Sequence, residues 1–245
     1  MAKRILGRID VALFLVLIVL FSVLTVLPKE VRVQKSVEIV PAEGYTTHMK
    51  LPAVDDSGKG IVTTLEVNVR PGSGRVLTDI DKLLFWIDTQ QSIQTAKSYA
   101  ANYTGIDTSN LDITYTLDAK VATLVGGPSA GAGLTIATIA ALENRTLKDS
   151  VMITGTINGD GSIGVVGGTV EKAGAAKNAG AELFLVPVGE STESYVKPNE
   201  KCTKEPGFVY CQTTYDKVTI NVAKDISIDV REVSNIREAL GYFLK

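Results

Sequence analysis

The chain has 245 residues, of which 45% are hydrophobic and 21% are charged, and its formal net charge is −2 at pH 7. This length and composition support one large globular domain or two small ones and argue against an intrinsically disordered chain. The nearly balanced charge argues against the basic surface that binds nucleic acid, so no nucleic-acid partner is expected.

An apolar run near the N-terminus predicts a membrane segment. Residues 11–27 carry no charge, and basic residues precede them. The run is at the short end of what spans a bilayer, so an uncleaved anchor competes with the hydrophobic region of a signal peptide. Because no small-residue cleavage pattern follows, the sequence favours a tail over 1–9 and a single transmembrane helix over 10–28. The basic flank favours a cytoplasmic N-terminus, which would place residues 29–245 outside the cytoplasm at the cell membrane.

Beyond the anchor, strand and helix patterns alternate. Period-two alternation and β-branched residues predict several strands in the first half of the chain. These strands cover residues 31–40, 61–74, 109–117 and 121–125. Between the second and the third of them, apolar and small residues at helical spacing predict a helix from about Leu83 to Tyr103.

The second half continues with helices and short strands. Residues 132–142 predict a helix that is rich in alanine and free of charge, which suits burial. The turn residues 158–161 predict a hairpin between strands at 150–157 and 161–168. A short helix over 169–180, a buried strand over 181–188 and an amphipathic helix over 233–244 follow. The predicted fold class is therefore α+β, with small mixed sheets and flanking helices.

Residues 189–224 differ from the rest because polar residues are frequent there. Long irregular segments in compact domains are often functional or disordered, and a long surface loop is expected. Cys202 and Cys211, the only cysteines, lie within it. Outside the cytosol they predict a disulfide that closes a short loop, and two reduced surface thiols are the alternative. No metal site is expected, because two thiols and the distant His48 cannot complete a tetrahedral site.

The sequence VGGPSAGAGL, which starts at residue 125, places Ser129 at the beginning of the predicted buried helix. Serine at such a position is most often an N-cap. It can also be a nucleophile, because unpaired N–H groups and the positive end of the helix dipole would stabilise an oxyanion there. The spacing of the motif alone leaves both interpretations open.

A nucleophilic serine needs a base. His48 is the single histidine and lies far upstream, so a Ser-His-Asp triad has only one candidate. A lysine can serve if burial lowers its pKa enough for some neutral amine to exist. Small apolar residues follow Lys172, which makes it a candidate for burial, whereas Lys177 beside Asn178 resembles a solvated helix face.

Two segments together resemble the proteolytic domain of the Lon protease family. They are GGPSAGAGLTIATIAAL at 126–142 and VMITGTINGDGSIGVVGGTVEKAGAAKNAGAELFLVPV at 151–188. The serine of that family lies in a Pro-Ser-Ala-Gly motif, and its lysine follows a Gly-Gly pair at the separation found here between residues 129 and 172. Weaker similarity extends from about residue 60 to the end. The resemblance implies the fold of that domain and a Ser-Lys dyad.

The resemblance also implies roles for single residues. Ser129 would be the nucleophile and Lys172 the general base. Thr154 falls on the threonine whose hydroxyl orients the lysine amine, with an ordinary strand residue as the alternative. Backbone N–H groups around Ser129 and Ala130 would form the oxyanion hole.

The sequence departs from the family pattern in several places. Gly126 stands where the family commonly has an aspartate, and DITYTLDAK at 112–120 replaces a strand that bears a histidine. No G-x-x-x-x-G-K-[ST] motif occurs in the chain, so ATP-driven unfolding of substrates is not expected of it. No cofactor is expected either.

The leading functional prediction is a membrane-anchored, ATP-independent serine endopeptidase that hydrolyses flexible or unfolded proteins. One alternative is a catalytically inactive Lon-like interaction module, and another is a small-molecule kinase of the galactokinase and homoserine-kinase superfamily, which has a related fold. The joint presence of Ser129, Lys172 and Thr154 favours the peptidase. Expected partners are protein or peptide substrates and the membrane, and the family resemblance implies a homo-hexamer.

Overall fold

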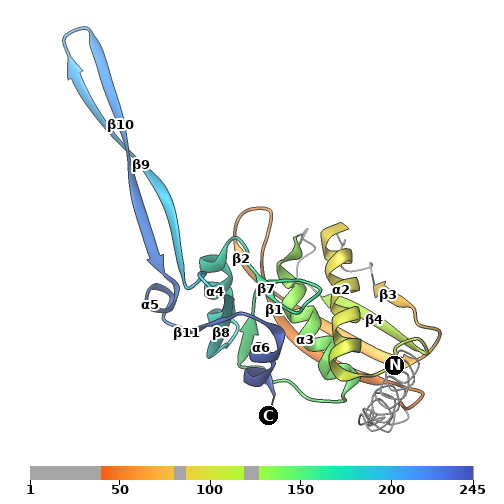
Figure 1. Cartoon of the computed structure of the whole chain (residues 1–245). Coiled ribbons are helices and arrows are strands. Elements are labelled where there is room, and N and C mark those ends of the chain that lie inside the picture. The colour runs from red at the N-terminus through yellow and green to blue at the C-terminus, as the bar shows by residue number, and fades with distance from the viewer. Residues whose placement is uncertain (1–39, 80–86, 119–126, 245) are drawn as a thin grey trace, which may run out of the picture. The chain divides into compact units, whose positions relative to one another are not determined.

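The computed structural model describes residues 40–79, 87–118 and 127–244 (Figure 1). Residues 39–245 belong to one compact unit. The tail predicted over 1–9, the transmembrane helix over 10–28 and the strand over 121–125 lie outside the described residues, as does the strand predicted over 31–40 except for its last residue. Within the described ranges, none of the helices is long and apolar enough to cross a membrane.

The fold begins with a four-stranded sheet in the order β1-β2-β4-β3. Its strands are β1 (Tyr45–Val54), β2 (Gly60–Pro71), β3 (Val76–Asp79) and β4 (Leu111–Asp118). Strands β1 and β4 both pair antiparallel with β2, whereas β3 runs parallel to β4. Successive side chains of a strand point to opposite faces, and accordingly Leu65, Val67 and Val69 of β2 are fully buried on one face.

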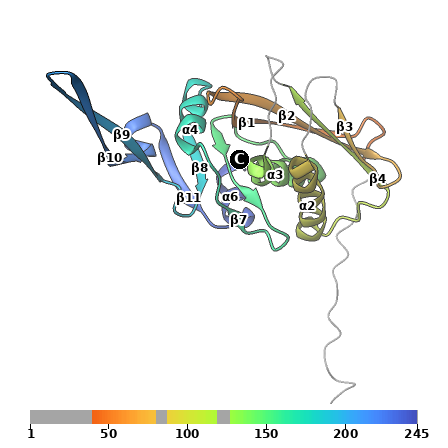
Figure 2. The same cartoon turned by 90° about the horizontal axis from the view of Figure 1, so that it is seen from above.

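Two helices, α2 (Ile87–Thr104) and α3 (Gly131–Leu142), cover the inner face of this sheet. Figure 2 shows both helices on the same side of the sheet. Every residue of α3 is buried, in agreement with its lack of charge. The Thr138 hydroxyl donates to Leu134 O at 2.7 Å and lies 2.8 Å from the Tyr115 hydroxyl oxygen. These bonds satisfy polar groups that would otherwise destabilise the core.

A second sheet has three parallel strands in the order β11-β8-β5. Its strands are β5 (Val151–Ile153), β8 (Leu183–Pro187) and β11 (Asp229–Val233). The helices that accompany it are α4 (Thr169–Asn178), α5 (Val222–Ile226) and α6 (Ile236–Phe243). The predicted α+β class, with small mixed sheets and flanking helices, is confirmed.

The hairpin predicted across 158–161 is present but shorter than expected. Only β6 (Thr156–Ile157) and β7 (Ile163–Gly164) pair with each other. The residues before them form β5, which pairs with β8 instead. The prediction of one strand over 150–157 was wrong because the partner of β5 is distant in sequence, and a local pattern does not reveal such a partner.

The surface loop predicted over 189–224 is instead a long hairpin of β9 (Thr192–Glu205) and β10 (Phe208–Asn221). In Figure 1 this hairpin projects away from the sheets and helices. Its turn contains Gly207, whose φ of +91° favours glycine. Nearly all residues of both strands are exposed, so neither strand needs the alternation of apolar and polar residues that would have identified it.

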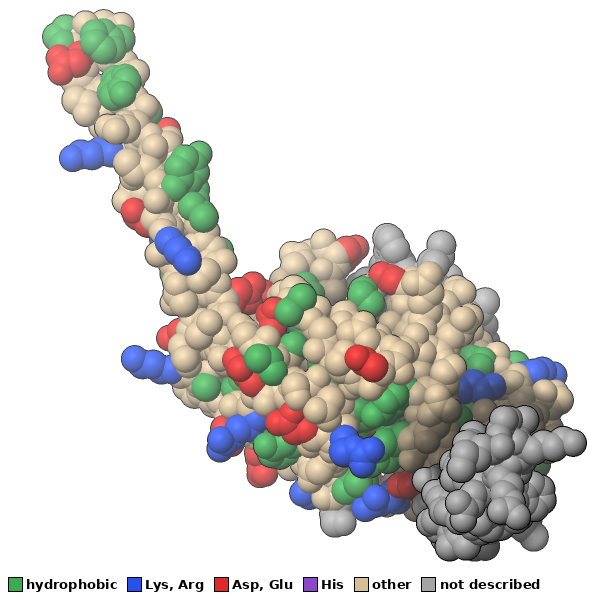
Figure 3. Space-filling view, in the orientation of Figure 1, with side chains coloured by type: hydrophobic (Ala, Val, Ile, Leu, Met, Phe, Trp, Pro, Cys, Tyr) green, Lys and Arg blue, Asp and Glu red, His purple; other side chains and the backbone are tan. Residues whose placement is uncertain are grey.

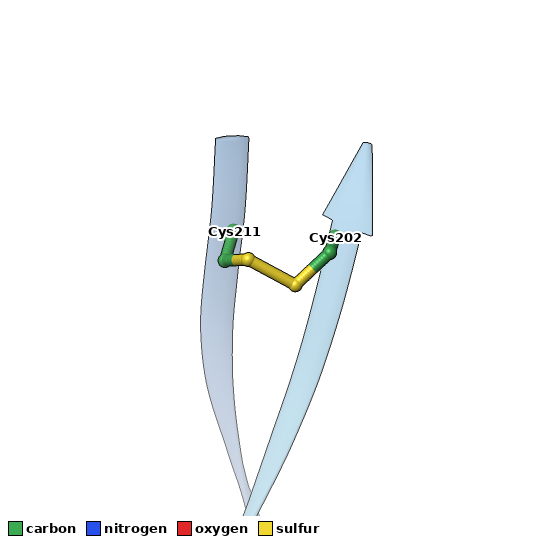
Figure 4. The surroundings of a disulfide bond; sticks show 2 residues. All are labelled: Cys202 and Cys211. Carbon is green, nitrogen blue, oxygen red and sulfur yellow. A yellow bond between two sulfur atoms is a disulfide. The ribbon is translucent and has the colours of Figure 1, made fainter. Parts of the chain in front are cut away.

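Cys202 and Cys211 lie directly opposite each other in this hairpin and form a disulfide (Figure 4). Their sulfur atoms also lie near the Glu200 carboxylate. A thiol binds a metal as the thiolate, and these two sulfurs are bonded to each other, so this group does not offer thiolate ligands.

The surface of the hairpin combines charged and hydrophobic side chains (Figure 3). Its exposed aromatic residues are Tyr195, Phe208, Tyr210 and Tyr215. A two-stranded hairpin alone is only marginally stable in water. The disulfide therefore supplies a covalent constraint where burial supplies little stabilisation.

Candidate active site

Ser129 is the central residue of a short 3-10 helix, η1 (Pro128–Ala130), which leads directly into α3. Gly127 before it has a φ of +102°, which favours glycine, and the proline that follows occupies the first helical position. Ser129 is partly exposed. The chain thus presents this serine at the N-terminal end of a buried helix, where the helix dipole is positive.

The carbonyl of Ser129 is held by the connection between β5 and β6. Gly155 N donates to this oxygen at 2.9 Å, and Thr154 Oγ1 donates to it at 3.4 Å. In the other direction, Ala132 N donates to Gly155 O at 3.0 Å. These bonds fix the backbone of the serine relative to the neighbouring strands.

Lys172 lies in the first turn of α4 and is only 3% exposed. The helix begins after Gly168, whose φ of +68° favours glycine. Small residues such as Ala173 and Ala176 bring the helix close to its neighbours. Helical side chains lean towards the N-terminus of their helix, and accordingly Lys172 Nζ donates to Gly167 O at 2.8 Å.

The surroundings of Lys172 lower the pKa of its amine to about 8. Burial is the main cause, because it disfavours the charged form, whereas the carboxylates of Glu190, Glu171 and Glu193 raise the pKa and limit the shift. At a pKa of about 8, about one amine in ten is neutral at pH 7, compared with about one in 3,000 at the ordinary value of 10.5. Lys172 can therefore accept a proton near neutral pH.

Ser129 and Lys172 line the same cleft, which has a volume of about 560 Å³. The other lining residues are Ala53, Val54, Gly127, Pro128, Thr156, Val165, Val166, Gly167 and Gly168. These other lining residues are uncharged, and most are small or apolar. The structure thus brings together the two residues that the sequence predicted as nucleophile and base.

Thr154 is buried beside Ser129, but its hydroxyl has a different partner from the one expected. It donates to Ser129 O, while the amine of Lys172 donates to Gly167 O. In this structure Thr154 therefore positions the backbone of the serine. Ala130, predicted to contribute to an oxyanion hole, is the last residue of η1 and the N-cap of α3.

We expect Thr154→Val to lower kcat/KM of peptide hydrolysis about tenfold and to cost about 1 kcal/mol of unfolding free energy. The variant keeps the β-branched shape but loses the hydrogen bond to Ser129 O. Steady-state kinetics and thermal unfolding would measure the two effects. Thr138→Val is a matched control, because it removes a buried threonine hydroxyl far from the cleft and should affect stability only. Normal kcat/KM in Thr154→Val would show that the hydroxyl does not position the serine.

His48 lies away from this cleft. It is exposed on β1, and its Nδ1 is 3.7 Å from Glu66 Oε2 on the paired strand β2. It is not among the residues that line the cleft around Ser129. The structure does not assemble a Ser-His-Asp triad from this histidine.

Two parts of the site were not predicted from the sequence. Ala53 and Val54, at the end of β1, form one wall of the cleft. Glu190 and Glu193 lie near the start of the long hairpin and act on the pKa of Lys172. Neither pair belongs to a local sequence motif. For Glu190 and Glu193, the only sequence signal was that acidic residues follow the predicted buried strand.

A family model for the Lon protease (S16) C-terminal proteolytic domain matches residues 53–219. The match covers more than half of the chain and includes both Ser129 and Lys172. The chain belongs to this family. The resemblance to the Lon proteolytic domain is thereby confirmed, and the chain carries a serine-type endopeptidase domain.

Several Lon proteases are similar to this Lon-type domain in sequence. The archaeal Lon protease of Thermococcus kodakarensis is 27% identical over 195 residues, which are 78% of this chain and 30% of that protein. The archaeal Lon protease of Archaeoglobus fulgidus is 25% identical over 226 residues, 89% of this chain and 31% of that protein. The Lon protease of Phenylobacterium zucineum is 32% identical over 149 residues, 58% of this chain and 18% of that protein. The chain thus spans less than a third of the length of each of these relatives.

Proposed function

We propose that this chain is a membrane-anchored serine endopeptidase that works without ATP and hydrolyses flexible or unfolded proteins through Ser129 and Lys172. The observation that carries the proposal is the cleft itself, where a serine at a helix start and a buried lysine with a pKa of about 8 lie together. A serine hydroxyl becomes a nucleophile when a neutral base is near it. Membership of the Lon proteolytic family supports peptide hydrolysis as the reaction.

In the acylation step, the neutral Lys172 amine accepts the proton of the Ser129 hydroxyl while Oγ forms a bond to the substrate carbonyl carbon. The carbonyl oxygen takes up the negative charge. Backbone N–H groups of Ser129 and Ala130 would stabilise this oxyanion at the positive end of the helix pair η1 and α3. The lysine ammonium then gives its proton to the leaving amine as the C–N bond breaks, and the acyl-enzyme remains.

In the deacylation step, water takes the place of the leaving amine. Lys172 accepts a proton from the water, whose oxygen attacks the ester carbon of the acyl-enzyme. The second tetrahedral intermediate collapses, the C–Oγ bond breaks, and the proton returns to Ser129. The products are a free carboxylic acid and the original enzyme.

The cleft fits extended polypeptide as the substrate. Its walls are apolar or small, and Val165 at its edge is 66% exposed, so the cleft is accessible from solvent. The chain has no P-loop motif that could drive the unfolding of a folded substrate. We therefore propose that it acts on segments that are already extended. The substrates, rather than the enzyme, would supply the flexibility.

The apolar run at 11–27 supports the proposed anchor, and the basic residues before it support a catalytic domain outside the cytoplasm. The disulfide between Cys202 and Cys211 is consistent with that oxidising side of the membrane. A homo-hexamer is proposed from family resemblance alone.

The proposal can be tested with the purified full chain in detergent micelles and unfolded casein as the substrate. We expect cleavage both with and without ATP, about tenfold faster at pH 9 than at pH 7, because the neutral fraction of Lys172 rises through its pKa of about 8. Cleavage that requires ATP would contradict the ATP-independent part of the proposal. A folded protein that cleaves nothing would favour the interaction module.

A further inference from the structure

The base of the β9–β10 hairpin contacts the first turn of α4, which carries Lys172. Glu193, near the start of β9, accepts a hydrogen bond from Val170 N at 3.2 Å. Glu190, between β8 and β9, accepts one from Thr169 Oγ1 at 3.1 Å. Thr169 is fully buried, and both glutamates are only partly exposed. The two bonds therefore connect the base of the hairpin to the first turn of α4, where water is partly excluded.

The bond to Glu193 replaces a side-chain cap that α4 does not have. The N-cap residue is Gly168, which has no side chain that could accept a bond from the first N–H groups of the helix. The Glu193 carboxylate takes that place from a different element, and a negative charge at a helix N-terminus is favourable. The first turn of α4 is held from the hairpin rather than by its own sequence.

The charges near Lys172 act in opposite directions. Burial and the positive end of α4 disfavour its ammonium form. The carboxylates of Glu190, Glu171 and Glu193 favour that form and raise the pKa of the amine. The remaining charged or titratable groups on β1, β2 and α5, which pack against α4, are Tyr45, His48, Lys50, Glu66, Arg70, Lys224 and Asp225. None of these seven is among the groups that shift the Lys172 pKa, and Lys50 Nζ donates to Ala179 O beyond the far end of α4.

We propose that Glu190 and Glu193 are positioning residues for Lys172, which fix the first turn of α4 from the base of the hairpin and so direct the amine into the cleft of Ser129. The inference rests on the proposed Ser-Lys chemistry and adds two residues to it. The two carboxylates have separate roles. Glu193 caps the helix, whereas Glu190 bonds a buried hydroxyl and places a negative charge near the amine.

The test compares variants of the full chain by the pH dependence of casein hydrolysis. In Glu190→Gln the amide oxygen can still accept the Thr169 hydroxyl, but the charge is gone. We expect the acidic limb of its kcat/KM profile to move to lower pH by about half a unit. Relative to the alkaline plateau of the same variant, activity at pH 7 should then be about threefold higher than in the wild type. A role in stability alone would not move this limb.

The cap is tested separately on the alkaline plateau, where Lys172 is neutral in every variant. Glu193→Ala should lower kcat about tenfold with little change in KM, because the amine is misdirected while the cleft walls remain. Glu193→Gln keeps an acceptor for Val170 N and should restore most of the plateau rate. Glu205→Gln, at the other end of the hairpin, is the matched control and should change neither the limb nor the plateau. Circular dichroism shows whether each variant is folded.

A readout without activity keeps this inference separate from the proposed function. In a Ser129→Ala background, the ¹³C resonance of the Lys172 side chain, assigned by its loss in Lys172→Met, reports the titration of the amine directly. Glu190→Gln should shift that titration to lower pH, whether or not the chain proves to be a peptidase. An unmoved titration in Glu190→Gln together with an unchanged plateau in Glu193→Ala would overturn the inference. Full activity of Ser129→Ala would instead refute the proposed function.

Discussion

Replacing Ser129 or Lys172 by alanine is expected to reduce casein hydrolysis by at least about 10³-fold. Ser129→Ala removes the oxygen that attacks the substrate, and Lys172→Ala removes the amine that accepts its proton. Because the two side chains line one cleft and act in the same step, the double variant should be no less active than either single variant. Rates at pH 9, where most of the wild-type amine is neutral, give the widest range for this comparison.

The control for this prediction is His48→Ala. His48 is exposed on β1 and does not line the cleft, so its loss should leave the rate close to that of the wild type. Substantial hydrolysis by Lys172→Ala would show that another group accepts the proton of the serine. A large loss in His48→Ala would point to that histidine as the group.

Replacing Lys172 by methionine is expected to stabilise the fold at pH 7 by about 2–3 kcal/mol. The pKa of this amine falls from 10.5 to about 8 on folding, and one pKa unit corresponds to about 1.4 kcal/mol. Between these two values the unfolded chain binds more protons than the folded one, so wild-type stability rises with pH across this window. Below pH 8 the folded protein carries the full cost of a buried ammonium. Methionine avoids this cost of about 3.5 kcal/mol but loses the bond to Gly167 O, which contributes about 1 kcal/mol, so a net gain of about 2–3 kcal/mol remains.

The measurement is chemical unfolding of the full chain in micelles at several values between pH 7 and pH 10.5. The advantage of Lys172→Met over the wild type should shrink steadily above pH 8. Lys177→Met is the matched control, because Lys177 lies in the same helix but is exposed. An advantage that does not change with pH would mean that Lys172 keeps an ordinary pKa in the folded protein.

Local sequence patterns predicted several of the elements that bury apolar surface along their own length, but they missed β1, in which Met49 and Leu51 are buried. The uncharged helix α3 and the apolar strand β8 are examples of the predicted elements, since each is buried through its own composition. The candidate dyad needed more than spacing, because a serine at a helix start is usually a cap and a lysine in a helix is usually exposed. The resemblance of two sequence motifs to the Lon family was the additional evidence for the dyad.

Other parts depend on contacts that no local pattern records. The hairpin β9–β10 is stabilised by pairing between its own strands and by a disulfide, so its polar sequence resembled a loop. The partner of β5 lies beyond a hairpin and a helix, which hid its parallel pairing with β8. The carboxylate of Glu193 became a helix cap only because folding brought two separate elements together.

The disulfide in the hairpin has a consequence for covalent continuity. Among the described residues, this hairpin projects away from the sheets and helices, where a peptidase can reach it (Figure 1). A single cut anywhere between Cys202 and Cys211 leaves both fragments joined through sulfur and aligned by the remaining strand pairs. The C-terminal fragment contains β11, whose neighbour β8 lies in the N-terminal fragment. A molecule nicked at its hairpin tip would therefore stay in one piece, and the nick would become visible as two fragments only under reducing conditions.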